Sequence, residues 1–166
     1  MTFDPVLLTA SDAPDMVALQ QEMLDALPSP RWYFPSRVEE YAAKAEGGFA
    51  LGLRENGRLI ALNIAIPAGM DDHSYAHILG TGEMRSLDFQ DIIVAPSHRR
   101  RGIHSFFLAL REREAREKGM TAIYATVDPE NEPSLRAFAK AGYAVVDQRE
   151  TYDGRPRCFV RRGLEG

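Results

Sequence analysis

The stretch DFQDIIVAPSHRRRGIH, residues 88–104, is the part of this 166-residue chain that decides its fold. Its first half, 88–94, predicts a buried strand, and the turn Ala95-Pro96-Ser97 ends that strand. A helix is expected from about Gly102 to Lys118, with apolar residues on one face and Arg and Glu on the other. The chain therefore passes from a buried strand through a basic turn into a helix.

The basic turn has the chemistry of an anion site. Gly102 lets the backbone approach a ligand closely, and the first turn of a helix carries N–H groups without helical acceptors. The helix dipole adds on the order of 0.3–1 kcal/mol for a negative group at that end. Arg99 and Arg101 can add charge-assisted hydrogen bonds. Arg-rich turns are also common on solvated surfaces, and the strand, turn, glycine and helix in this order favour a site.

The composition describes a mildly acidic globular chain. Twenty Lys and Arg against 24 Asp and Glu give a net charge of −4, which argues against nucleic acid or an anionic membrane as a partner and makes the basic cluster at 98–101 a local feature. The one cysteine, Cys158, cannot form an intrachain disulfide. The beginning of the chain lacks a secretory signal pattern, and no apolar run approaches the ~20 residues of a membrane span. We expect one domain over residues 1–166 and a cytoplasmic location.

The rest of the chain predicts a mixed α/β sheet with helices on its faces. Asn56-Gly57 and Asp153-Gly154 are typical of tight hairpin turns, and residues 67–87 show no clean period, so we expect a long connection there. The aromatic loop 27–35 has three prolines and should lack regular structure. The expected strands are 6–9, 49–54, 58–66, 88–94, 122–127, 144–152 and 157–160, and the expected helices are 13–26, 36–46, 102–118 and one that Asn131 caps and Gly142 ends.

Two motifs resemble the GNAT acyltransferase superfamily. Its first signature is Gln or Arg, two arbitrary residues, Gly, one arbitrary residue, and Gly or Ala; Arg99 and Gly102 match it, while His104 stands in the last position. The segment 126–143 is similar to its later motif, and the residues in register are Asn131, Ser134, Phe138, Gly142 and Tyr143. Both motifs, in order and about 30 residues apart, indicate an N-acetyltransferase.

The resemblance implies a mostly antiparallel sheet of six to seven strands, flanked by about four helices, with acetyl-CoA as the acetyl donor and no metal. The strands 88–94 and 122–127 would splay apart, so that the backbone of Ile92 and Val94 pairs with pantetheine. The pyrophosphate would lie on the basic turn, and the cofactor arm near the thioester would meet the later motif. The implied cofactor-binding residues are Ile92, Val94, Arg99, Arg100, Arg101, Gly102, Ile103, His104, Asn131, Ser134 and Phe138.

The implied reaction is direct attack of a primary amine on the acetyl carbonyl, with no covalent enzyme intermediate. Phe138 occupies the position at which many members have the tyrosine that protonates the leaving thiolate, and phenylalanine cannot donate. Tyr143, Tyr124 or a water molecule could supply that proton. For the base, Asp91 and Glu83 are the candidate carboxylates, acting directly or through water.

The acceptor is not defined by any motif. Trp32, Tyr33 and Phe34 either line an acceptor pocket or form a packing plug, and the acceptors used across the superfamily include peptide N-termini, lysine side chains, amino acids, polyamines and aminoglycosides. Asn131 and Ser134 also fit a simple helix cap, Asp91 a salt-bridged strand residue, and Tyr143 a packing residue. The polar residues Asp71, Asp72, His73 and His77 lack metal-ligand spacing and are expected to be solvated.

Two functions of other classes stay open from the sequence. One is a sensor that binds acyl-CoA without transferring the acyl group, which the missing tyrosine favours. The other is nucleic-acid binding through residues 98–101, which the acidic composition disfavours. A P-loop nucleotidase is excluded because its Gly-x-x-x-x-Gly-Lys-Ser/Thr motif is absent. A homodimer through the C-terminal strands is a further expectation.

Overall fold

The computed structural model describes residues 2–70, 74–151 and 153–164, and these form two compact units. The first unit contains the chain up to residue 64 together with 91–107, and the second contains 65–90 and everything from 108 onward. We describe each unit by itself, and the expectation of one domain stays a prediction.

The described residues form five α-helices and seven strands. The helices are α1 (Ala13–Asp25), α2 (Val38–Glu46), α3 (Tyr75–Leu79), α4 (Ile103–Glu117) and α5 (Glu132–Lys140), with short 3-10 turns η1 (Ala10–Asp12), η2 (Pro30–Trp32) and η3 (Pro96–His98). The strands are β1 (Val6–Leu7), β2 (Ala50–Glu55), β3 (Arg58–Pro67), β4 (Ser86–Val94), β5 (Ala122–Val127), β6 (Ala144–Glu150) and β7 (Pro156–Gly163). Their order is β1-β2-β3-β4-β5-β7-β6. The pairings β1–β2, β2–β3, β5–β7 and β6–β7 are antiparallel and β4–β5 is parallel, which confirms the mixed, mostly antiparallel sheet.

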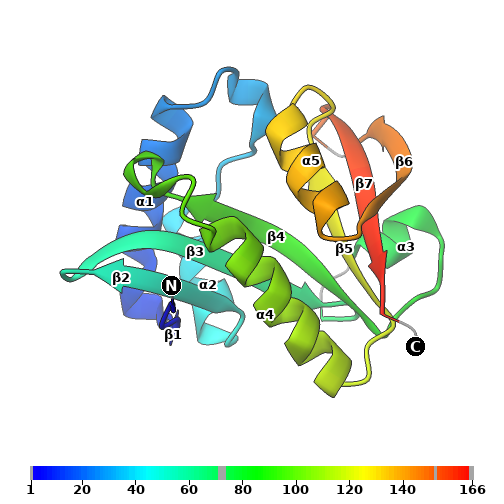
Figure 1. The fold of residues 1–166 in the computed structure, drawn as a ribbon, viewed down its shortest axis with the longest axis horizontal. Coiled ribbons are helices and arrows are strands. Elements are labelled where there is room, and N and C mark those ends of the chain that lie inside the picture. Colours follow the sequence, from blue (N-terminus) through cyan, green and yellow to red (C-terminus); the bar gives the residue numbers. More distant parts are fainter. Residues whose placement is uncertain (1, 71–73, 152, 165–166) are drawn as a thin grey trace. The chain divides into compact units, whose positions relative to one another are not determined.

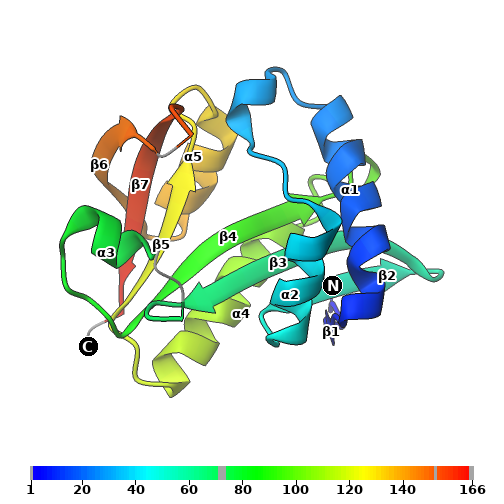
Figure 2. The same cartoon turned by 180° about the vertical axis from the view of Figure 1, so that it is seen from behind.

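In the first unit, α1 and α2 cover one face of the β2–β3 hairpin, as both views show (Figures 1 and 2). Asn56 and Gly57 have φ of 52° and 81°, so the turn adopts the left-handed backbone that this pair predicts. The apolar stripe of α1 supplies the core, with Met16 and Leu19 fully buried. Tyr41 of α2 is also completely buried, although it carries a hydroxyl.

In the second unit, α5 and α3 lie on opposite faces of the strands β5 and β7 (Figures 1 and 2). Ala76 of α3 packs against Ala122 and Tyr124 of β5. On the α5 face, the rings of Phe89 in β4 and Phe138 in α5 lie 6.5 Å apart between centroids. Both faces of this part of the sheet are therefore covered, as expected.

The parallel pairing of β4 with β5 is short. Within the described part of the second unit it joins 86–88 to 122–124 and does not continue to Phe89 and Ala125. Phe89 and Ala125 are therefore not paired with each other, as the resemblance implies for these two strands.

Three local expectations were wrong. The connection 67–87 contains the helix α3, whose start is capped by the Ser74 hydroxyl accepting from the His77 N–H at 3.4 Å. Its end is set by Gly80 with φ of 69°, and five residues are too few to show a helical period. The aromatic loop contains the 3-10 turn η2, and α2 begins at Val38 rather than at Ser36.

No helix in the described ranges has the length and apolar character required to cross a membrane.

The packing of β2 leaves no room for a side chain at Gly52, which generates a stability prediction. A Cβ there would lie 2.7 Å from Leu59 Cδ1 and 2.8 Å from Leu8 Cδ2, and both leucines are buried. We expect Gly52→Ala to lower the free energy of unfolding by about 1–3 kcal/mol, measured by urea denaturation. In a Leu8→Ala background the same substitution should cost less, because the opposing methyl groups are gone. Equal costs in both backgrounds would contradict this account of the packing.

Candidate active site

The strand β4 leads directly into the basic turn at the end of the first unit. The Ala95 N–H donates to the Ile60 carbonyl of β3 at 2.8 Å, and the His98 N–H donates to the Ala95 carbonyl at 2.8 Å. These bonds fix the turn between β4 and α4. Ile92 and Val94, whose backbone was expected to meet pantetheine, are half-buried on this strand.

The backbone of the turn has the form of an anion cradle. Arg100 and Gly102 have φ of 63° and 79°, whereas Arg101 between them is outside the left-handed region. Alternation of this kind turns successive N–H groups toward one side. A non-glycine residue such as Arg100 in the left-handed region stores on the order of 1 kcal/mol of strain. The first bond of α4 runs from the Phe106 N–H to the Gly102 carbonyl at 2.9 Å, so the N–H groups of Gly102 and Ile103 precede the helical ladder.

The space beside this backbone is open. A Cβ built on Gly102 would meet no atom within 4 Å apart from its chain neighbours, so this side of the turn is open. The side chains of Arg99 and Arg100 are exposed to solvent at the same place. The turn thus combines backbone N–H donors, positively charged side chains and open space beside Gly102.

Glu55 of β2 balances part of that charge. Its Oε1 lies 3.2 Å from His98 Nε2 and its Oε2 lies 3.8 Å from Arg101 Nη1. Because Glu55 and Arg101 are both about half exposed, their pairing contributes little, about 0–1 kcal/mol, and a phosphate group can compete for the guanidinium. Burial lowers the pKa of His104, so its imidazole is neutral at pH 7 and adds no charge to the cradle.

Asp91 lies on the same strand, three residues before its end, and is only 6% exposed. Its Oδ1 accepts the hydroxyl hydrogen of Tyr33, and its backbone carbonyl accepts from Asn63 Nδ2 at 2.9 Å. Its Oδ2 is buried and accepts no hydrogen bond from the residues the structure describes. Burial raises the pKa of this carboxyl from 3.8 to about 6, because the charged form loses hydration. The structure therefore brings together Asp91 and Tyr33, which the sequence had placed in separate roles.

Three residues of this network were missed from the sequence. The Tyr41 hydroxyl lies 3.1 Å from that of Tyr33 and donates to Gln20 Oε1 at 2.8 Å. Asn63 is the lone polar residue inside the apolar run 59–66 of β3, and that interruption is a signal that could have found it. Gln20 is likewise a polar residue at a buried position of α1, between Met16 and Met23, whereas Tyr41 carries no comparable signal.

The other aromatic residues of the acceptor loop differ from Tyr33. Trp32 is half-buried in η2, whereas Phe34 is 50% exposed. Of the three, Tyr33 contacts Asp91 through its hydroxyl. The loop therefore combines a half-buried, hydrogen-bonded tyrosine with an exposed ring and is not a uniform packing plug.

Glu83, in the second unit, is held in an ion pair. Arg161 donates to both carboxylate oxygens, from Nε at 2.8 Å and from Nη2 at 2.7 Å, and the Tyr124 hydroxyl also donates to it. The Arg161 guanidinium holds the pKa of Glu83 below its usual value. A carboxylate with both oxygens engaged and a lowered pKa is a weak base, so this geometry favours a structural role.

The later motif builds the start and end of α5. Asn131 Oδ1 accepts from the Ser134 N–H at 3.3 Å, which confirms the expected helix cap. Phe138 is buried, and its ring meets that of Tyr143 edge-on with 5.0 Å between centroids. The Tyr143 hydroxyl is buried without a hydrogen-bond partner in the described part of the chain, and burial raises its pKa.

Within the described ranges, no three His, Cys, Asp or Glu side chains gather as a metal site. His77 is exposed on α3, and Asp71, Asp72 and His73 lie outside the described residues.

The raised pKa of Asp91 generates a stability prediction. Because its folded pKa of about 6 exceeds the unfolded value of 3.8, its contribution to stability is present below about pH 4 and is lost as pH rises through 6. Relative to Asp91→Asn, the natural protein should lose about 3 kcal/mol of unfolding free energy over that window, measured by denaturation at each pH. Glu83→Gln is the opposite control, since a lowered pKa gives stability that is lost as pH falls. A flat difference for Asp91→Asn would show that the carboxyl titrates normally.

Comparison with known proteins gives the family. The sequence model of the acetyltransferase (GNAT) family matches residues 15–143. A comparison with curated proteins found no match. Among solved structures, the Escherichia coli ribosomal-protein-S18-alanine N-acetyltransferase is 17% identical with a TM-score of 0.73, over 99% of this chain and 96% of that one. A Salmonella typhimurium protein in a structure with its cofactor acetyl-CoA is 16% identical with a TM-score of 0.73, over 100% and 96%.

A third similar structure is the N-acetylglutamate synthase of Neisseria gonorrhoeae with coenzyme A and N-acetylglutamate. It is 15% identical with a TM-score of 0.75, and the match covers 100% of this chain and 36% of that larger one. These identities establish a shared fold, and the family match extends over most of the sequence. The chain belongs to the acetyltransferase (GNAT) family.

Proposed function

We propose that this protein transfers the acetyl group of acetyl-CoA directly to a primary amine of a small molecule or peptide. The observation that carries the proposal is the turn at Arg100 and Gly102, where left-handed backbone and open space lie at the start of α4. Such a turn is suited to a pyrophosphate, because backbone N–H groups and a helix dipole act on it together. Family membership and the acetyl-CoA in the Salmonella structure support the same donor.

The residues of the turn divide the work of holding the cofactor. The N–H groups of Gly102 and Ile103 would bind the pyrophosphate, and the exposed guanidinium groups of Arg99 and Arg100 would neutralise it. Arg101 would join them by leaving Glu55. When bound, acetyl-CoA supplies the activated acetyl group. The backbone of Ile92 and Val94 and the residues of α5 stay proposed contacts of the cofactor arm.

Asp91 is the base that this arrangement favours. It has a buried, unoccupied acceptor oxygen and a pKa of about 6, so near neutral pH it is ionised and can take a proton from an attacking ammonium or amine. Glu83 has both oxygens engaged by Arg161 and is the weaker candidate.

For the proton that the thiolate needs, Tyr143 is favoured over Tyr124. Its hydroxyl has no partner in the described residues and its raised pKa keeps it protonated, whereas the Tyr124 hydroxyl is engaged by Glu83. Phe138 cannot serve, and water is the remaining alternative.

The phenylalanine at position 138, where many members have the proton-donating tyrosine, favours a second function. Binding and chemistry use different residues, so a chain with an intact cradle but without the usual tyrosine could bind acyl-CoA as a sensor and transfer nothing. The test below separates the two by measuring binding and turnover on the same preparations.

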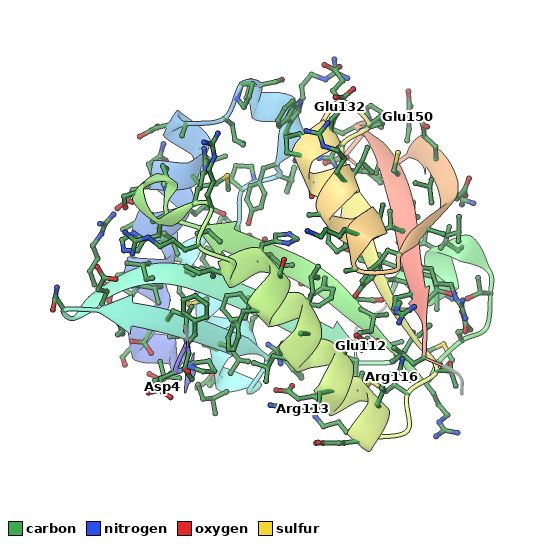
Figure 3. All side chains as sticks on the ribbon, in the orientation of Figure 1. Asp4, Glu112, Arg113, Arg116, Glu132 and Glu150 are labelled. Carbon is green, nitrogen blue, oxygen red and sulfur yellow. The ribbon has the colours of Figure 1, made fainter. Side chains whose placement is uncertain are left out.

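Calorimetry with acetyl-CoA tests the cradle directly. The natural protein should bind in the micromolar range, and Arg99→Ala/Arg101→Ala should weaken binding at least about tenfold, because two charge-assisted contacts are lost. The matched control is Arg113→Ala/Lys118→Ala, which removes the same charge from exposed positions, one in the later part of α4, where Figure 3 labels Arg113, and one directly after its end. The control should bind like the natural protein.

Turnover is then followed as release of the CoA thiol with a panel of peptides, lysine, amino acids, polyamines and aminoglycosides. Acetylation of one amine class supports the enzyme, and binding without transfer to any of them supports the sensor. Equal loss of binding in both double variants would mean that net charge alone attracts the cofactor. Absence of binding in the natural protein would overturn the proposal.

A further inference from the structure

The two carboxylate oxygens of Asp91 have different surroundings. Oδ1 accepts from the Tyr33 hydroxyl, while Oδ2 is buried and receives no hydrogen bond from the described residues. Leaving a buried acceptor without a donor is costly, and a catalytic role is one of the reasons for which native structures retain such an atom. The carboxylate therefore presents one oxygen that the protein holds and one that it leaves open.

The hydroxyl that holds Oδ1 lies beside polar side chains of two helices. Tyr33 lies 3.1 Å, between hydroxyl oxygens, from Tyr41 of α2, and Tyr41 donates to Gln20 of α1 at 2.8 Å. Gln20 in turn bonds both backbone groups of Ser36, donating to its carbonyl at 2.9 Å and accepting from its N–H at 2.8 Å. The chain of contacts ties the loop that precedes α2 to the carboxylate on β4.

We propose that Tyr33 is a positioning residue for acetyl transfer: its hydroxyl holds Oδ1 of Asp91 so that Oδ2 faces the acceptor amine and takes its proton. The inference rests on the proposed function, in which Asp91 is the base. In the step, the nitrogen electron pair of the amine would form the bond to the acetyl carbon, an N–H bond would break and its proton would pass to Oδ2. The C–S bond of the thioester would break with its electron pair on sulfur, and the thiolate would take a proton from Tyr143 or water. Tyr33 keeps its own proton throughout and holds the base in place. The sequence had suggested instead that Tyr33 lines an acceptor pocket.

The charges around Asp91 determine the direction of the expected effect. Burial raises its pKa most, while the hydrogen bond from Tyr33, the positive charge of Lys44 and the nearby Tyr41 hydroxyl lower it, and the negative charge of Glu40 raises it. The pKa of Tyr33 is raised well above its ordinary value by burial and by the neighbouring carboxylate, so its hydroxyl stays a donor. Removing that hydroxyl leaves the burial of Asp91 less compensated, and the carboxyl must then titrate at higher pH.

The test is the pH profile of kcat/KM in Tyr33→Phe, measured with saturating acetyl-CoA and the amine of the panel that the natural protein acetylates fastest. The acidic limb, near pH 6 in the natural enzyme, should move upward by about one pH unit or more, because a hydrogen bond to the charged form is lost. The KM for acetyl-CoA should not change. Tyr41→Phe should move the limb in the same direction by less, and it tests the proposal independently if Tyr33→Phe does not fold.

Tyr75→Phe is the control, since it also removes a part-buried hydroxyl, one that lies 3.4 Å from the Phe89 carbonyl. Its limb should stay in place. A second readout, the carbon NMR titration of the Asp91 carboxyl, measures the same coupling without turnover and should shift with the limb in Tyr33→Phe. Tyr33→Phe should add no further loss in an Asp91→Asn background, because the group it positions is gone.

The outcomes distinguish this inference from the function on which it rests. A natural protein that acetylates no amine contradicts the proposed function, and this inference with it, before any variant is made. An active natural protein whose limb is unmoved in Tyr33→Phe contradicts this inference alone. If the carboxyl titration shifts in Tyr33→Phe while the rate profile does not, Tyr33 is a structural partner of Asp91 only, and that result would also overturn this inference.

Discussion

The hydrogen bond from the Ala95 N–H to the Ile60 carbonyl, 2.8 Å long, anchors the end of β4 on β3, and the candidate site of the first unit depends on that anchor. Asp91 lies four residues before it and the left-handed turn at Arg100 and Gly102 follows it. Because one short piece of backbone carries both, the spacing between the proposed base and the proposed pyrophosphate site is built into the strand. A shift of β4 along β3 would move them together.

The two parts of this site follow opposite electrostatic rules. The turn keeps its arginines in water, where they cost little to hold and where Glu55 offers only a weak competing charge. Asp91 is taken out of water, so its carboxyl titrates near pH 6 instead of near 4. Exposed positive charge suits capture of a charged cofactor, and a buried acid with a raised pKa suits proton transfer near neutral pH.

The sequence predicted the parts of the molecule that local rules determine. The Asn56-Gly57 hairpin, the cap at Asn131 and the basic turn all follow from residue type and spacing over a few positions, and the strand 122–127 was predicted with its observed bounds. The short helix α3 was missed, because five residues between a serine cap and Gly80 leave no period to read.

The network around Asp91 escaped prediction for a different reason. Gln20, Tyr33, Tyr41 and Asp91 come from α1, the loop before α2, α2 itself and β4, and their contacts are tertiary. Asp91 and Tyr33 were each singled out from the sequence, but as a base and as a pocket residue with no link between them. For Glu83, a tertiary contact argues against the role that the sequence suggested. Its ion pair with Arg161, 78 positions away in the sequence, makes it a weaker base than Asp91, although the two carboxylates had equal standing from the sequence alone.

The central claim is that the turn at Arg100 and Gly102 receives the cofactor pyrophosphate, and a crystal structure of the protein with coenzyme A tests it most directly. We expect pyrophosphate oxygens within hydrogen-bonding distance, about 2.7–3.2 Å, of the N–H groups of Gly102 and Ile103. Coenzyme A bound with its pyrophosphate elsewhere, and with this turn facing only solvent, would contradict the account.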